Sequence, residues 1–157
     1  MKFEQVGSMT FGETIDITDP CYSRDVWCRM NDVEIEPGEY DCYVCWSDCG
    51  TWGNRVKAIA ITKNKQYIKV LRNLGKLGVI GVDAGMAGFF NKKQDFSDSE
   101  WSEFCDKVGV NKLFFSPNNE YVCNGFFSES GYGDGEYPVL VHRNDDGIPN
   151  ALMLKFL

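Results

Sequence analysis

The sequence has little positive charge and only one histidine, His142. Lysine and arginine together number 16 against 23 aspartates and glutamates, which gives a net charge of −7 at neutral pH. Nucleic acids and anionic membranes bind proteins mainly through Lys and Arg side chains that neutralise phosphates. The charge balance therefore argues against nucleic acid and membrane as partners, and it suits a basic protein partner.

The sequence also lacks long hydrophobic runs. No window approaches the ~20 uncharged apolar residues of a membrane-spanning helix, and residues 1–6 have no apolar run typical of a signal peptide. Seven cysteines, an odd number, in a chain with no export signal are typical of reduced thiols. We therefore expect a cytoplasmic protein.

Internal repeats, low-complexity segments and linkers are absent, so residues 1–157 are expected to form a single domain. A chain of this length can bury roughly 70% of its unfolded surface. Hydrophobic residues make up 43% and aromatic residues 14%, which excludes a disordered chain. The aromatic content is large enough to supply both a core and a binding surface.

Apolar and polar residues alternate in several short stretches, as in the run from Tyr40 to Trp46. This period of two is typical of half-buried strands, and the turn signals between them predict adjacent antiparallel pairing. We predict a mainly β, β-rich α+β fold: an antiparallel meander of eight to ten strands forming a sandwich or a partly open barrel. The predicted strands are 2–6, 13–18, 39–47, 55–62, 67–71, 112–115, 121–127, 137–143 and 151–157.

One segment has helical spacing instead. Ser97 and Glu100 form a capping-box pattern, and apolar residues follow at helical spacing until Gly109. This pattern predicts one amphipathic helix over residues 98–108, docked on the sheet by Trp101 and Phe104.

Residues 78–90 combine four glycines with an apolar run that carries one charge, Asp83. Glycine within a strand pattern indicates a bend or the close approach of another backbone. We expect two short buried strands with a break near Ala84 and Gly85. A buried carboxylate at Asp83 would need hydrogen-bond partners.

Cysteine and histidine chemistry is weakly indicated. Cys42 and Cys45 are three residues apart on a predicted strand, so we expect them to face opposite sides, which disfavours a zinc site and favours small buried apolar groups. A Cys21 nucleophile would need His142 as its base, and nothing in the sequence brings the two together. We therefore predict no metal, no other cofactor and no catalytic residues, and we favour a non-enzymatic protein while leaving enzymatic activity open.

The glycines at 131, 133 and 135 resemble a phosphate loop only superficially. Phosphate loops lead into a helix N-terminus, whereas this segment leads into the predicted strand at Tyr137. Its neighbours Glu129, Asp134 and Glu136 would also repel an anion. We expect a tight connection in which glycines adopt positive φ.

Asp19, Asp83 and Asp134 each lie beside a proline or in a glycine-rich stretch. Two interpretations remain open. Each aspartate could fix a turn by accepting backbone N–H bonds, which short Asp side chains do readily. Alternatively, the three could meet at a metal or act as acid and base. The first interpretation is favoured.

Three segments carry a resemblance: Ile-Thr-Asp-Pro-Cys-Tyr (17–22), Gly-Val-Asp-Ala-Gly-Met-Ala-Gly (81–88) and Tyr-Gly-Asp-Gly-Glu-Tyr-Pro-Val (132–139). Together they resemble a group of small uncharacterised proteins of bacteria and their phages, whose function is unknown. That group often has Gly where this chain has Thr18. The resemblance implies a bacterial or phage source rather than an activity. It also implies that Asp19, Asp83 and Asp134 belong to one shared feature.

These observations lead to three functional hypotheses. The first is a non-enzymatic binding protein that recognises a protein partner, in an immunity-type or phage accessory role. The second is a protein that binds or sequesters a small molecule such as a nucleotide signal, with aromatic side chains stacking on a base. The third is a metal-dependent hydrolase that uses paired carboxylates. The sequence leaves the oligomeric state open. The predicted binding residues are Asp19, Tyr22, Asp83, Gly85, Tyr132, Asp134 and Tyr137.

Overall fold

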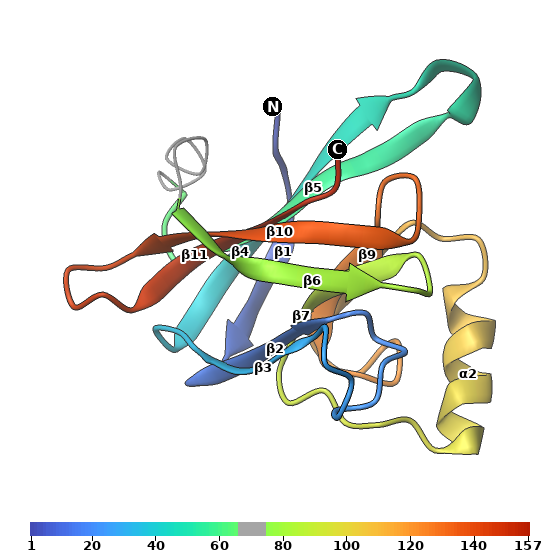
Figure 1. Cartoon of the computed structure of the whole chain (residues 1–157), viewed down its shortest axis with the longest axis horizontal. Coiled ribbons are helices and arrows are strands. Elements are labelled where there is room, and N and C mark those ends of the chain that lie inside the picture. Colours follow the sequence, from blue (N-terminus) through green and yellow to red (C-terminus); the bar gives the residue numbers. More distant parts are fainter. Residues whose placement is uncertain (66–74) are drawn as a thin grey trace.

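Figure 1 shows the computed structural model of the chain, which describes residues 1–65 and 75–157. Two antiparallel sheets and one helix form a mainly β sandwich, as predicted, and the described strands form no closed barrel. The first sheet has the order β1 (Glu4–Phe11), β4 (Gly38–Asp48), β5 (Asn54–Thr62), β11 (Pro149–Lys155), β10 (Gly135–Arg143), β6 (Gly75–Val82). The second has the order β3 (Met30–Glu34), β2 (Thr14–Thr18), β7 (Met86–Phe90), β9 (Gly125–Glu129), β8 (Leu113–Ser116).

The alternation in β4 sorts its side chains onto the two faces of the first sheet. Tyr40, Cys42 and Val44 belong to the main core cluster, together with Ile17 of the second sheet. Cys45 belongs to a separate cluster with alanines of β5 and β11. Cys42 and Cys45 therefore act as small buried apolar groups on opposite faces, as the sequence predicted.

The predicted meander is wrong in its strand order. β5 lies beside β11, and β6 lies beside β10, so strands far apart in the sequence are neighbours. β3 was not predicted, and β1 is longer than the 2–6 segment expected there. The predicted strand 121–127 is also wrong, because only β9 from Gly125 onward pairs, and Val122 adopts φ 66° in the preceding turn. The strand predicted at 67–71 lies outside the described residues.

The glycine-rich stretch 78–90 crosses from one sheet to the other. β6 belongs to the first sheet and β7 to the second, with the predicted break between them. Gly85 adopts φ 69° in this turn, a conformation that side chains rarely adopt. A Cβ atom on Gly88 would lie 2.3 Å from the carbonyl oxygen of Phe126 in β9. The glycines therefore do permit close backbone approach, although β6 and β7 do not pair as a hairpin.

Helix α2 spans Asp98–Val108, as predicted, and begins with the full capping box of Ser97 and Glu100. Phe104 is buried and packs between Phe96 and Phe127 of the second sheet. Trp101 docks less completely than expected, because it remains 44% exposed. Among the described residues, no helix is long and apolar enough to cross a membrane.

Candidate functional site

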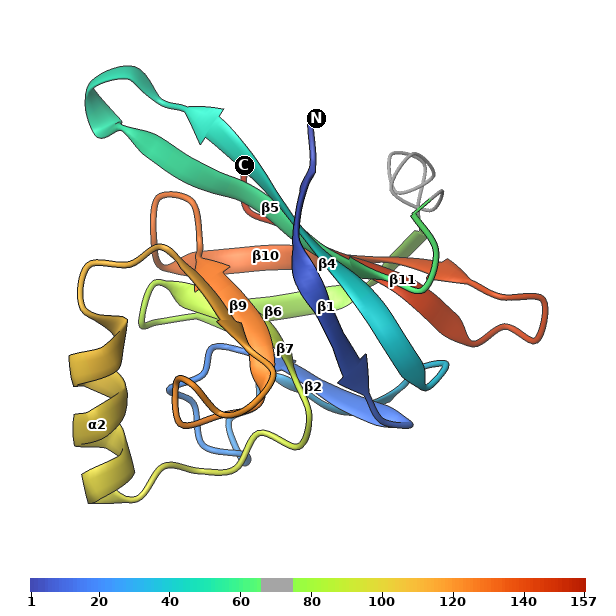
Figure 2. The ribbon, with the colours of Figure 1, turned by 180° about the vertical axis from the view of Figure 1, so that it is seen from behind.

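Several connections gather at the end of the molecule where α2 lies (Figures 1 and 2). They are the loop after β2, the β6–β7 turn, the β9–β10 loop and the tip of the β4–β5 hairpin, which contains the short 3₁₀ helix η1 (Gly50–Trp52). Because loops positioned by a rigid scaffold commonly carry function, these connections form the candidate site. This end of the molecule also contains all seven binding residues predicted from the sequence.

Asp19 joins the loop after β2 to the β6–β7 turn. Its side chain is fully buried. One carboxylate oxygen accepts a hydrogen bond from the Cys21 N–H at 2.8 Å. The other accepts hydrogen bonds from the N–H groups of Asp83 at 2.9 Å and Ala84 at 2.7 Å. A single buried carboxylate thus satisfies three backbone donors and holds two connections together.

The β9–β10 loop adds the third segment. The Ser130 N–H donates to the carbonyl oxygen of Gly85 at 3.0 Å. A Cβ atom on Gly85 would lie 3.9 Å from the Gly133 Cα and 4.0 Å from an Asp134 carboxylate oxygen. The three segments that carry the resemblance are therefore adjacent. We call this arrangement the Asp19 junction: Asp19, Asp83, Ala84, Gly85 and Ser130.

Of the three aspartates, Asp19 alone contributes a buried carboxylate to the Asp19 junction. Asp83 and Asp134 are exposed, so the expectation of a buried carboxylate at Asp83 is wrong. Asp83 contributes its backbone N–H, and the buried carboxylate belongs to Asp19. Among the described residues, no group of three or more His, Cys, Asp or Glu side chains is placed to hold a metal ion. The turn-fixing interpretation of Asp19 describes this geometry.

Tyr137 braces the glycine loop instead of presenting an open ring. Its hydroxyl donates to the Gly133 carbonyl oxygen at 2.5 Å, and its ring packs edge-on against Phe156. The loop glycines at 131, 133 and 135 all have positive φ, as expected for a tight connection. Base stacking on Tyr137 is therefore obstructed by its own structural contacts.

Cys21 and His142 occupy different settings. Burial, and then the nearby Asp19 carboxylate, raises the pKa of the Cys21 thiol well above its usual range. The thiol is therefore protonated near neutral pH, which is the unreactive form. His142 lies in β10, where its Nδ1 is 2.7 Å from the Asn150 side-chain oxygen of β11. This arrangement offers no activated cysteine nucleophile.

A buried charge cluster centred on Asp16 of β2 has no signal in the sequence. Asp16 is 1% exposed. Its carboxylate accepts hydrogen bonds from the backbone N–H of Asp32 at 2.9 Å and from that of Lys93 at 2.7 Å. Its carboxylate also lies 3.0 Å from the Arg24 guanidinium and 3.5 Å from that of Arg29, whose side chain is fully buried. No local sequence pattern identifies the two arginines as the partners of Asp16.

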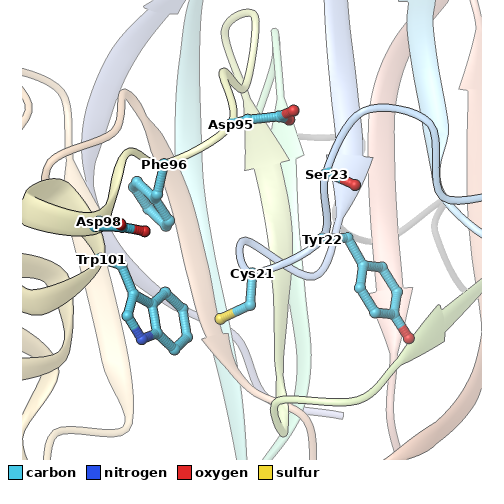
Figure 3. Close-up of a pocket in the computed structure, with 7 residues that line it drawn as sticks. All are labelled: Cys21, Tyr22, Ser23, Asp95, Phe96, Asp98 and Trp101. Atoms are coloured by element: carbon cyan, nitrogen blue, oxygen red, sulfur yellow. The ribbon is translucent and has the colours of Figure 1, made fainter.

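A pocket of about 280 Å³ lies between the loop after β2 and the start of α2 (Figure 3). Of its lining, only Tyr22 was predicted as a binding residue. Trp101 projects from the helix toward Cys21 on the opposite wall, and Asp98 lies at the start of the helix. The lining residues are Cys21, Tyr22 and Ser23 from the loop, and Asp95, Phe96, Asp98 and Trp101 from the helix side.

An exposed cluster of Trp52, Arg55 and Tyr132 borders a second hollow of about 430 Å³, and we call it the aromatic patch. Trp52 is 66% exposed and Tyr132 is 61% exposed, and their ring centroids lie 6.4 Å apart in an edge-to-face arrangement. The Arg55 guanidinium carbon lies 6.0 Å from the Tyr132 ring centroid. Tyr132 was predicted, but no sequence signal places it beside the hairpin tip.

Comparison with known proteins gave no match: neither a protein-family model, nor a curated protein, nor a solved structure matches this chain. The described residues present a buried junction with structural contacts, an exposed aromatic patch on one side of it and a pocket with two aspartates on the other. The last two features can bind a ligand or a partner.

Proposed function

We propose that this chain is a small non-enzymatic binding protein that recognises a protein partner through the aromatic patch. The observation that carries the proposal is the exposure of Trp52 and Tyr132 beside Arg55. Trp, Tyr and Arg are the residues that most often dominate the binding energy of protein interfaces. An immunity-type or phage accessory role fits such a protein, in keeping with the resemblance of its three segments.

The patch is held in place from both sides. The Arg55 side chain donates to the carbonyl oxygens of Trp52 at 3.0 Å and Gly131 at 3.5 Å, which links the hairpin to the glycine loop. Lys112 adds a further link, because its ammonium donates to the Asn54 carbonyl oxygen at 2.6 Å. Groups that are already ordered lose little conformational entropy on binding, which favours affinity.

The surroundings of the patch favour a basic partner. Asp48 lies just before η1, and Asp134 and Glu136 follow Tyr132; all three are exposed. Together with the net charge of −7, these carboxylates would speed association with a positively charged surface. The proposal places the protein in the cytoplasm, and its seven free thiols support that location.

Replacing Trp52 by alanine is expected to weaken partner binding by about 30-fold, because truncating a central aromatic anchor costs about 2 kcal/mol or more. The measurement is capture of partners from bacterial lysate by the tagged protein, followed by affinity measurement on the purified partner. Salt should weaken capture by slowing association.

Trp27→Ala is the matched control for this experiment. Trp27 is 86% exposed, more than Trp52, and lies outside the aromatic patch. The proposal expects Trp27→Ala to retain binding. Equal capture by the wild-type and Trp52→Ala proteins, or a larger loss with Trp27→Ala, would contradict it.

The alternative of small-molecule binding has support from the pocket beside α2. Its volume of about 280 Å³ lies just below the range of ~300–1,000 Å³ typical of ligand pockets. The carboxylates of Asp95 and Asp98 would repel the phosphates of a nucleotide. The pocket therefore suits a small ligand without negative charge better than a nucleotide signal.

A further inference from the structure

We propose that the pocket between the loop after β2 and α2 is a binding site for a guanidinium group, carried by a free organic cation or by an arginine side chain. This site is separate from the aromatic patch and does not depend on the function proposed for it. The proposal rests on three features of the pocket: its two carboxylates, its open indole ring and its size.

The carboxylates come from Asp95 and Asp98. Asp95 is held in position by one of its oxygens, which accepts the Arg24 N–H at 2.8 Å. Asp98 is the first residue of α2 and lines the pocket on its helix side (Figure 3). The nearby Glu100 is committed to the capping box, where it accepts the Ser97 N–H. Two carboxylates beside one concave surface favour a cation over an anion.

The indole of Trp101 supplies an aromatic face that solvent can reach. Its ring stacks on Phe104 with centroids 6.0 Å apart, lines the pocket and remains 44% exposed. The same aromatic cluster already binds a cation inside the protein, because the buried Lys93 ammonium lies 3.7 Å from the Phe96 ring centroid. Trp101 offers an external cation a ring of the same cluster, and Trp is the best cation–π partner.

Guanidinium fits these features better than ammonium does. It is planar, stacks on aromatic rings, and pairs with carboxylates through two parallel N–H bonds. The volume of about 280 Å³ is large enough for the head group of an arginine side chain. The protein's own Arg24 and Arg29 do not fill the pocket, because both guanidinium groups contact Asp16.

The test is an NMR titration that follows the indole N–H signal of Trp101. The probes are N-acetyl-arginine amide and its neutral isostere N-acetyl-citrulline amide, each raised to several times the ~1 mM dissociation constant expected for so small a site. We expect saturable shifts with the arginine amide and none with the citrulline amide. Salt at about 1 M should weaken the binding, because it screens exposed charges.

Matched variants localise the site. Asp98→Asn is expected to weaken binding by about threefold to fivefold, the value of one partly exposed ion pair. Asp106→Asn removes the same charge from an exposed position later in α2, outside the pocket lining, and should leave binding unchanged.

A five-residue peptide with a central arginine distinguishes the two possible sources of the guanidinium group, a protein side chain and a free organic cation. Binding of the peptide indicates a protein side chain, whereas binding of the free amide alone indicates a small cation.

Three results would overturn the proposal. The first is an unchanged Trp101 signal throughout the arginine amide titration. The second is equal binding of the citrulline amide, which would show that charge is irrelevant. The third is an equal loss of binding in the Asp98→Asn and Asp106→Asn proteins, which would show only a general effect of net charge.

Discussion

Replacing Asp19 by alanine lowers the free energy of unfolding by about 3–5 kcal/mol. The Asp19 carboxylate is fully buried and accepts hydrogen bonds from the backbone N–H groups of Cys21, Asp83 and Ala84. The substitution would leave these three donors without their acceptor. A buried donor left without a partner costs about 1–3 kcal/mol, and bonds to a charged acceptor are at the stronger end. Denaturant unfolding at neutral pH measures the change.

Asp83→Ala is the matched control for Asp19→Ala. The Asp83 carboxylate is exposed, and its N–H remains available to Asp19 after the substitution. We expect a change within about 0.5 kcal/mol. If Asp83→Ala destabilised the protein as much as Asp19→Ala, the junction would depend on the Asp83 carboxylate, contrary to the hydrogen bonding described above.

Replacing Asp16 by asparagine is expected to cost about 3–5 kcal/mol of stability, because it leaves a buried arginine without a counterion. The Arg29 side chain is fully buried, and the Asp16 carboxylate lies 3.5 Å from its guanidinium. Asparagine keeps the shape of the side chain but removes the charge and one acceptor, so both Arg29 and the Lys93 N–H lose a partner. Thermal or urea unfolding provides the measurement.

Asp32→Asn serves as the control for Asp16→Asn. Asp32 also contacts Arg24, but its side chain is 59% exposed, and exposed ion pairs contribute at most about 1 kcal/mol. Asparagine also tolerates the φ of 52° that Asp32 adopts. Equal destabilisation by Asp16→Asn and Asp32→Asn would show that burial of the Asp16 cluster adds nothing to stability.

The elements that the sequence predicts well are those specified by neighbouring residues. The capping box of Ser97 and Glu100 marks the start of α2, because both hydrogen bonds form within four residues. Alternation in β4 likewise places Cys42 and Cys45 on opposite faces. Local patterns do not determine the strand order, because it depends on pairing between distant segments such as β5 and β11.

The site was predictable only in part for the same reason. The glycines and aspartates marked the three segments of the junction, but not which carboxylate was buried. Asp19 and Asp83 both lie in special turn contexts, and only the fold shows that Asp19 accepts and Asp83 donates. Trp52 and Tyr132 are 80 positions apart in the chain, so their contact leaves no local signal.

Amide hydrogen exchange in the Asp19→Asn protein tests the central claim most directly, namely that Asp19 holds together the connections between the aromatic patch and the pocket beside α2. We predict that exchange at Asp83 and Ala84 accelerates by about 5- to 30-fold, since about one to two kcal/mol of local protection is lost. Exchange at the Ser130 amide, which bonds to Gly85 in the same junction, should also accelerate. Exchange at amides within β4 should stay unchanged. Unchanged exchange at Asp83 and Ala84, or the same acceleration in Asp83→Asn, would contradict the account.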